Sequence, residues 1–278
     1  MAVVLTALLA GCAGPGGSPA TPVAPSPGAA IDRQGGHVPE FALRAYASFT
    51  RADAVAIASR EWRLFGQPVD DDPPDTRPPL PPELKPERMA GLWERVGEYW
   101  WISQEPDRSE GSWTGKHDAA GSEFSANEDY NYAWSAAFVS YVMRIAGAGP
   151  RFPYSPSHYT YINLAREMSL NQTTGWAIVA ERIDTYAPRP GDIICATRDG
   201  TRRVRFDDLP TRRAFPAHCA IVVAASGGEI SIIGGNVDDA VTLTHVPTTP
   251  DGRLALAGDV PVDTRYPWFV VLRVLYDN

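Results

Sequence analysis

Short apolar segments recur from Gly191 almost to the end of the chain, and this series of segments constrains the fold more than any other feature. Each segment has the length of a strand, and small residues between the segments favour turns. The segments are GDIICAT, HCAIVVAA, EISIIGGN, VTLTHV and WFVVLRVLY, at Gly191–Thr197, His218–Ala225, Glu229–Asn236, Val241–Val246 and Trp268–Tyr276. We therefore predict an antiparallel sheet in the C-terminal part of the chain.

The chain before Gly191 has helical spacing instead. The predicted helices are Pro39–Phe65, Glu87–Ile102, a helix opened by Trp134-Ser135 and ended by Gly147, and a helix from near Ser157 to Met168 or Leu170. Residues 70–86, which are proline-rich, and residues 103–131, which are polar, are predicted to be loops. Helices followed by antiparallel strands indicate an α+β fold, in which the first two helices form an N-terminal helical subdomain.

Composition excludes several classes of function. The length of 278 residues allows one large or two small domains. A net charge of -8 argues against a nucleic-acid surface. No metal and no cofactor is predicted, because the histidines lack metal-ligand spacing and no Gly-rich loop joins a strand to a helix. The histidines are His37, His117, His158, His218 and His245.

The first residues resemble a bacterial lipoprotein signal. The apolar segment AVVLTALLA ends in Leu9-Ala10-Gly11-Cys12, which resembles a lipobox whose cysteine is lipidated. No Lys or Arg precedes the apolar core, so an ordinary secretion signal or a start codon placed too late are the alternatives. Residues 13–37 are predicted to be a flexible tether, because Gly, Pro, Ser and Ala dominate as far as Ala30.

These features predict where the protein resides. We expect a lipid-anchored protein of the bacterial cell envelope. Ala13 does not resemble the aspartate that retains lipoproteins at the inner membrane, which favours the outer membrane facing the periplasm. In that oxidising compartment, Cys195 and Cys219 are compatible with a disulfide. Two buried free thiols on neighbouring strands are the alternative.

A serine, a histidine and an asparagine occupy positions that suit a hydrolytic site. Ser135 opens a helix, His218 opens one strand of a hairpin, and Asn236 ends the next strand. His218 and Asn236 are equidistant from Gly227 in the turn, so their Cβ atoms are expected roughly 5 Å apart on one face of the sheet. Asn236 would then orient the imidazole of His218. Alternation directs Cys219 to the opposite face.

Each of these residues also has a structural explanation. Serine is a favourable N-cap residue, and a buried histidine often serves only the core. The three residues together predict a catalytic site in which Ser135 is the nucleophile, His218 the general base and Asn236 its orienter. The backbone N–H of Ser135 would be one oxyanion donor.

The same segments resemble a known superfamily. Four segments are similar to parts of CHAP and NlpC-type amidases and peptidases. The helix AWSAAFVSYVMRIAG resembles the helix that carries their nucleophile, and the turn Pro188–Asp192 resembles the entry to their next strand. The run HCAIVV resembles their histidine strand, and Gly235-Asn236 resembles the strand end that carries their third catalytic residue. Over Val38–Tyr276 the chain is more closely similar to an uncharacterised bacterial lipoprotein family, domain of unknown function 2272, which is related to those enzymes. This resemblance implies a papain-like fold, with a helical part at 38–116 and an α+β core at 117–278.

The resemblance also implies a function. Papain-like amidases of this type cleave amide bonds in peptidoglycan peptides, which makes a cell-wall peptide the expected partner. The chain departs from the pattern at two positions: Ser135 stands in place of cysteine, and Gly234 in place of a glutamate that many CHAP enzymes carry. A serine lacks a stable thiolate and needs a base during attack. An inactive module that binds cell wall or peptide is therefore the alternative to an enzyme, and a vestigial cleft is a third reading.

Four more residues are candidates for the cleft. His158 follows Ser155-Pro156-Ser157 at a predicted helix start, where it would reach the cleft as a substrate ligand or auxiliary acid, or make a local hydrogen bond. Trp134, Tyr132 and Tyr130 flank Ser135 and would line a peptide or sugar groove, although as core aromatics they are equally natural. The sequence leaves the oligomeric state open.

Overall fold

The computed structural model describes residues 47–74, 76–103, 109–198 and 204–277. Within these residues the chain has an α+β fold, as the order of helices and strands predicts. These described residues belong to a single compact unit. The proposed lipid signal with Cys12, the tether and residues 39–46 of the predicted Pro39–Phe65 helix lie outside the described residues. Residues 47–50 are not helical, because Thr50 is the N-cap of a helix that begins at Arg51. None of the described helices has the length and hydropathy needed to cross a membrane.

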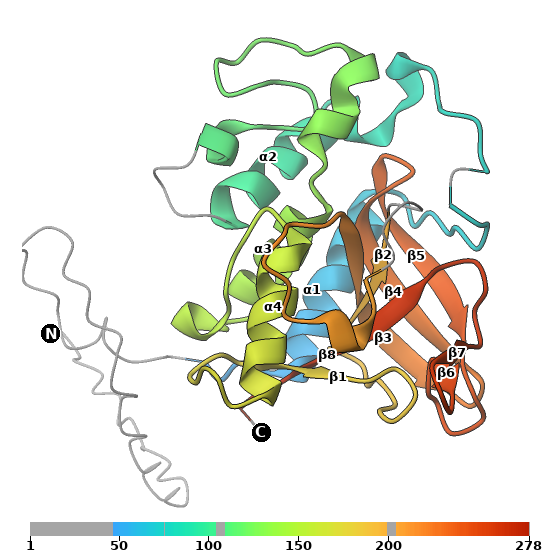
Figure 1. Ribbon diagram of the computed structural model, residues 1–278. Coiled ribbons are helices and arrows are strands. Elements are labelled where there is room, and N and C mark those ends of the chain that lie inside the picture. The colour runs from blue at the N-terminus through green and yellow to red at the C-terminus, as the bar shows by residue number, and fades with distance from the viewer. Residues whose placement is uncertain (1–46, 75, 104–108, 199–203, 278) are drawn as a thin grey trace, which may run out of the picture. The chain divides into compact units, whose positions relative to one another are not determined.

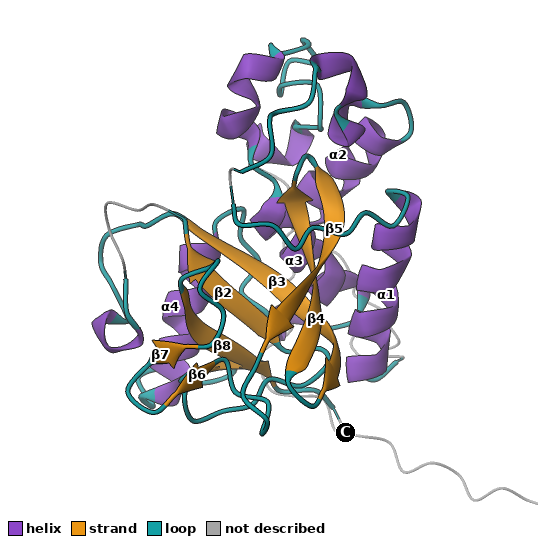
Figure 2. Ribbon diagram, turned by 90° about the vertical axis from the view of Figure 1, so that its right-hand side faces the viewer, coloured by secondary structure: helices purple, strands orange, loops and turns teal. Residues whose placement is uncertain are grey.

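A six-stranded sheet, counted over the described residues, runs in the order β1-β8-β2-β3-β4-β5 with antiparallel neighbours throughout. Figure 2 shows its central strands from the side. Its strands are β1 (Ile178–Glu181), β2 (Ile193–Thr197), β3 (Ala217–Ser226), β4 (Glu229–Val237), β5 (Ala240–Pro247) and β8 (Trp268–Val274). The strands β6 (Ala255–Leu256) and β7 (Val260–Pro261) form a separate short hairpin. All five predicted strands are therefore confirmed, and β1 is the element of this sheet that the sequence pattern missed.

Helices cover one face of this sheet (Figure 1). The α-helices of the described chain are α1 (Arg51–Leu64), α2 (Leu92–Ser103), α3 (Ser135–Ile145) and α4 (His158–Ser169). Short 3-10 turns lie between these helices and strands, at Pro82–Leu84, Pro86–Arg88, Ser109–Ser112, Ala126–Tyr132, Gly149–Arg151 and Phe206–Asp208. The helix predicted from Glu87 therefore begins only at Leu92. The turn at Ala126–Tyr132 forms because Ser125 and Glu128 make a capping box, a local signal that the prediction of a plain loop overlooked.

The apolar residues divide into two cores, one on each face of the sheet. Ile193, Cys195, Cys219 and Ile221 face the helices, whereas their chain neighbours face the opposite side. This alternation is the period-2 pattern of a sheet buried on both faces, and it explains why these strands are apolar runs without polar gaps. Every residue of α3 from Ser135 to Met143 is buried, because this helix lies between the sheet and the other helices.

A buried acid joins the N-terminal helical part to α3. Glu61 of α1 is fully buried and accepts hydrogen bonds from Arg95 and Tyr99 of α2 and from Tyr141 of α3. These donors hold the pKa of Glu61 below its ordinary value, although burial by itself would raise it. The helices before Ser135 are therefore fastened to the same core as the sheet.

The hairpin of β3 and β4 differs from the predicted one in its turn. Ser226 pairs with Glu229, so the turn comprises Gly227 and Gly228 and is displaced by half a residue from Gly227. A bulge between Val222 and Ala224 compensates for this displacement, and Ile221 pairs with Ile233 as a turn centred on Gly227 would require. The register near His218 thus agrees with the expected one through two irregularities that cancel.

Gly235 allows α3 to approach this hairpin closely. A Cβ atom at Gly235 would lie 2.6 Å from Cβ of Phe138 and 2.7 Å from the ring of Trp134. Gly235→Ala is expected to lower the free energy of unfolding by about 1–3 kcal/mol, measured by urea denaturation, because backbone and helix must separate. Gly227→Ala is the control, since a Cβ there meets nothing within 4 Å. Equal stability of the two variants would contradict this account.

Candidate active site

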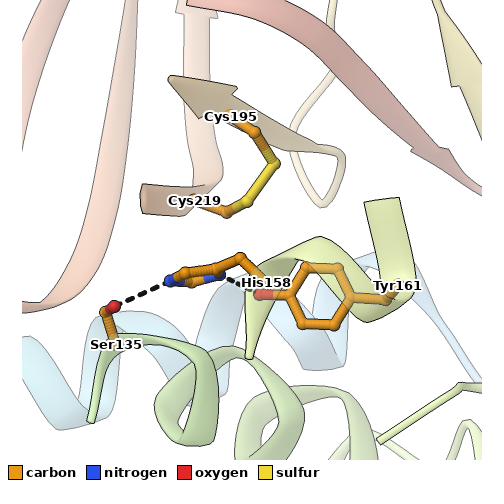
Figure 3. The surroundings of a disulfide bond; sticks show 5 residues. All are labelled: Ser135, His158, Tyr161, Cys195 and Cys219. Atoms are coloured by element: carbon orange, nitrogen blue, oxygen red, sulfur yellow. Dashed lines mark hydrogen bonds between the residues drawn. A yellow bond between two sulfur atoms is a disulfide. The ribbon is translucent and has the colours of Figure 1, made fainter. Parts of the chain in front are cut away.

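Ser135 is the first residue of α3, and its hydroxyl is bonded to a histidine. Trp134 is the N-cap and makes no side-chain capping bond, so Ser135 is not the capping residue that its position suggested. The Ser135 Oγ lies 2.7 Å from Nε2 of His158 and is buried. Figure 3 shows the hydroxyl directed at this imidazole. Sequence reasoning selected the right serine for an imidazole contact but assigned it a different histidine.

His158 lies between Ser135 and a tyrosine. It is the first residue of α4, and its Nδ1 is hydrogen-bonded to the hydroxyl of Tyr161, one turn further along the same helix (Figure 3). Burial is the main cause that holds the pKa of His158 well below 6.5, and the neighbouring His218 and Arg198 add to the effect. The imidazole is therefore neutral at pH 7, which is the state that a general base requires.

His218 and Asn236 lie near this pair but do not form the predicted relay. The ring centroid of His218 is 5.8 Å from that of His158. No hydrogen bond joins His218 to Ser135 or to Asn236 among the described residues. Asn236 has a left-handed φ of 57° and stands at a bulge between β4 and β5, so its side chain leaves the strand alternation on which the predicted pairing relied.

Two adjoining hollows meet at this point. The main cleft encloses about 710 Å³. It is lined by Ser135, by His158 and by residues of the 3-10 turn Ala126–Tyr132. The small hollow encloses about 260 Å³ on the sheet face of Ala196, Ala220 and Ile232, and His218 lines it. Arg198 and Asn236 line both. A ligand in the main cleft can therefore contact the serine and also reach the border of the small hollow.

Two of the three aromatic residues predicted to line a groove lie elsewhere. Trp134 is 1% exposed and donates its indole N–H to Glu87 Oε2 at 2.6 Å, so its ring belongs to the core. Tyr132 is stacked on Phe124 at a centroid distance of 3.9 Å and lines neither hollow. Tyr130, the third, is 77% exposed and lines the main cleft.

The cysteines predicted as a candidate pair are bonded. Cys195 and Cys219 occupy directly opposite positions of β2 and β3, with Cα atoms 4.1 Å apart, and form a disulfide that is completely buried. Figure 3 shows the disulfide above the hydrogen-bonded residues Ser135, His158 and Tyr161. Cys219 faces the helices, on the side opposite to His218, as the alternation along β3 predicts.

Three carboxylates converge beside the main cleft. Oxygen atoms of Glu87, Asp129 and Asp239 lie within 4.8 Å of one another. The Lys85 ammonium is 2.6 Å from Asp129 and 3.3 Å from Asp239, and Glu87 accepts the Trp134 indole N–H. Arg88 adds a second cation 2.9 Å from Asp129. The two cations offset the two aspartates, and the contacts occupy oxygens that a metal ion would use, so the cluster gives no reason to assign a metal.

Tyr161, Arg198 and Glu87 are the site residues that the sequence analysis missed. Tyr161 left a usable signal, because residues three apart on a helix share a face and His158 was already a candidate. Arg198 left none, because it lines both hollows from the end of β2, where the chain path depends on tertiary packing. Glu87 left none either, because it contacts Trp134 from a 3-10 turn and lines neither hollow.

The fold and site define a class of protein: an α+β domain with a buried serine–histidine pair at the start of a helix, open to a cleft. A family model described as "Uncharacterized protein conserved in bacteria (DUF2272)" matches residues 87–274. The chain belongs to this family, as the resemblance of its segments implied. No match was found among curated proteins or among solved structures.

Proposed function

We propose that the protein is a hydrolase that cleaves an amide bond, with Ser135 as nucleophile and His158 as general base. The observation that carries the proposal is the 2.7 Å contact between the Ser135 hydroxyl and Nε2 of a neutral, buried imidazole, beside a cleft of about 710 Å³. A serine is a weak nucleophile by itself and needs a base within hydrogen-bond reach. His158 thus takes the role of general base that the sequence analysis assigned to His218.

The reaction follows from this geometry. Ser135 Oγ attacks the carbonyl carbon while its proton passes to Nε2 of His158. The imidazolium then gives the proton to the leaving amine as the C–N bond breaks, which leaves an acyl-serine. Water hydrolyses this ester, with the same imidazole as base. The first N–H groups of α3, which have no intrahelical acceptor, are the donors available to the oxyanion.

The substrate proposed is a peptide of the bacterial cell wall. Support comes from the likeness of the helix, turn and strand segments to CHAP and NlpC-type enzymes of papain-like fold. The same likeness and the lipobox-like N-terminus support a lipid-anchored protein of the cell envelope. The cleft suits an extended peptide, because it is open along a loop with both charged and apolar side chains.

One observation favours a second function, a binding module without catalysis. The Tyr161 hydroxyl is fully buried and has no acceptor other than His158 Nδ1 among the described residues. If Tyr161 donates its hydrogen to Nδ1, then Nε2 carries the other hydrogen and donates it to Ser135, so the imidazole is not a base for the serine. Catalysis needs the other tautomer, with Nδ1–H donating to Tyr161.

Digestion of muropeptides by the complete chain tests the proposal. We expect new fragments in mass spectra that correspond to the addition of one water at an amide bond. A fluorophosphonate probe should also add to the tryptic peptide that contains Ser135, because an activated serine is its target. Binding to sacculi without fragments and without labelling would contradict the hydrolase and support the binding module.

The tautomer gives an independent measurement. In ¹⁵N spectra of the imidazole, the hydrolase requires the proton of His158 on Nδ1, whereas the binding module requires it on Nε2. The measurement needs no substrate, so it distinguishes an inactive site from an enzyme offered the wrong peptide.

A further inference from the structure

Three polar side chains come together at the border of the two hollows. The side chains of Arg198, His218 and Asn236 make no hydrogen bond or ion pair with any residue in the described part of the chain. Arg198 is exposed, and the other two are half-buried. All three come from different strands or strand ends, so their convergence is a product of the fold and not of chain proximity.

The other charged groups that line the two hollows are held in ion pairs. In the small hollow, Arg77 pairs with Asp70 at 2.8 Å and with Asp238 at 3.1 Å. In the main cleft, Lys85 takes the corresponding role between Asp129 and Asp239. Among the described lining residues, Arg198 is thus the cation that has no ion-pair partner. Its charge also disfavours protonation of both neighbouring imidazoles, which lowers their pKa values.

The convergence points to an anion-binding subsite, and we infer that Arg198, with Asn236 and His218, binds the free C-terminal carboxylate of a peptide whose nearby amide bond lies at Ser135. This inference rests on the proposed function for the position of the amide, but the carboxylate site itself does not depend on catalysis. The substrate class would be peptides cleaved close to a free carboxyl end.

The chemistry of the three groups suits a carboxylate. The guanidinium offers parallel N–H donors that match both oxygens of a carboxylate. The Asn236 amide and one imidazole nitrogen of His218 are further neutral donors. Gly234 leaves the space that His218 occupies, because a Cβ there would lie 2.8 Å from the imidazole Nε2. His218 and Asn236 thereby acquire a binding role in place of the catalytic role predicted for them.

The test measures binding, separately from turnover. Acetyl-alanyl-alanine and its C-terminal amide are titrated into the complete chain, and the NMR signals of the His218 imidazole and the Asn236 amide are followed. We expect the free acid to bind at least roughly tenfold more tightly than the amide, since a charge-assisted bond to arginine is lost in the amide. Both side-chain signals should move with the free acid.

Variants distinguish the site from general charge attraction. Arg198→Gln should remove the preference for the free acid, and Asn236→Gly, which suits the left-handed backbone, should weaken binding roughly three- to tenfold. Arg212→Gln, at an exposed arginine that lines neither hollow, should retain the preference. Equal binding of acid and amide by the unaltered chain, or an unchanged preference in Arg198→Gln, overturns the inference. Absence of amide cleavage with this preference intact would overturn only the hydrolase.

Discussion

His158→Gln is expected to lower kcat for amide cleavage roughly 10³-fold or more, measured on muropeptides by product formation. The glutamine amide can still donate to or accept from Ser135, but it cannot take the proton of the attacking hydroxyl. Ser135→Ala should lose activity to a similar extent, because residues of one catalytic unit are not additive. A hydrolase that used His218 as its base, as the sequence alone suggested, would retain most of its kcat in His158→Gln.

His218→Gln is the informative counterpart. It should raise KM while kcat stays within about threefold, since His218 lines the hollow proposed to hold the peptide carboxylate and is not hydrogen-bonded to the serine. His117→Gln is the control for loss of an imidazole, because His117 lines neither hollow and packs on Trp93. The assignment of His158 fails if His218→Gln loses kcat as severely as His158→Gln does.

Glu87→Gln is expected to make the protein more stable at pH 8 than the unaltered chain, by on the order of 3 kcal/mol. The pKa of Glu87 is raised from its ordinary 4.5 to about 8. Burial is the main cause of this shift, and the charge of Asp239 is the second. The native state therefore holds this proton between pH 4.5 and 8, while the unfolded chain releases it. The stabilisation is complete below pH 4.5 and is lost as the pH rises through 8.

Urea denaturation between pH 5 and pH 8.5 measures this effect. The difference between Glu87→Gln and the unaltered chain should grow with pH, because glutamine does not titrate yet can still accept the Trp134 indole N–H. Glu83→Gln, at an exposed glutamate in the preceding 3-10 turn, controls for the removal of one negative charge. A difference that is the same at every pH would show that the Glu87 carboxyl is not protonated in the native state.

Local patterns predicted the elements of this fold well. Apolar spacing predicted α2, α3, α4 and five strands, because burial repeats with the period of the element itself. The four-residue strand β1 escaped notice, since so short a run carries too little period to distinguish it from a loop. The opposite orientations of His218 and Cys219 also followed from alternation alone.

The candidate site was only partly predictable. The sequence selected Ser135, His158, His218 and Asn236 as the residues to watch, and all four line the two hollows. Their grouping was not predictable, because Ser135 and His158 are 23 residues apart and belong to different helices. The hairpin pattern in the sequence does not encode the bulge at Asn236, which turns the side chain of this residue away from the strand alternation.

The amino-acid sequence by itself determined the order of the main helices and strands, the face on which side chains of the regular strand segments lie, and membership of the bacterial family, since these depend on spacing along a few consecutive residues. Only the tertiary structure decided which imidazole the Ser135 hydroxyl meets and that Arg198 has no ion-pair partner among the described residues. The packing of α4 against α3 and the path of the loops set those distances, and hydrogen bonds and ion pairs act over a few ångströms that no local pattern encodes.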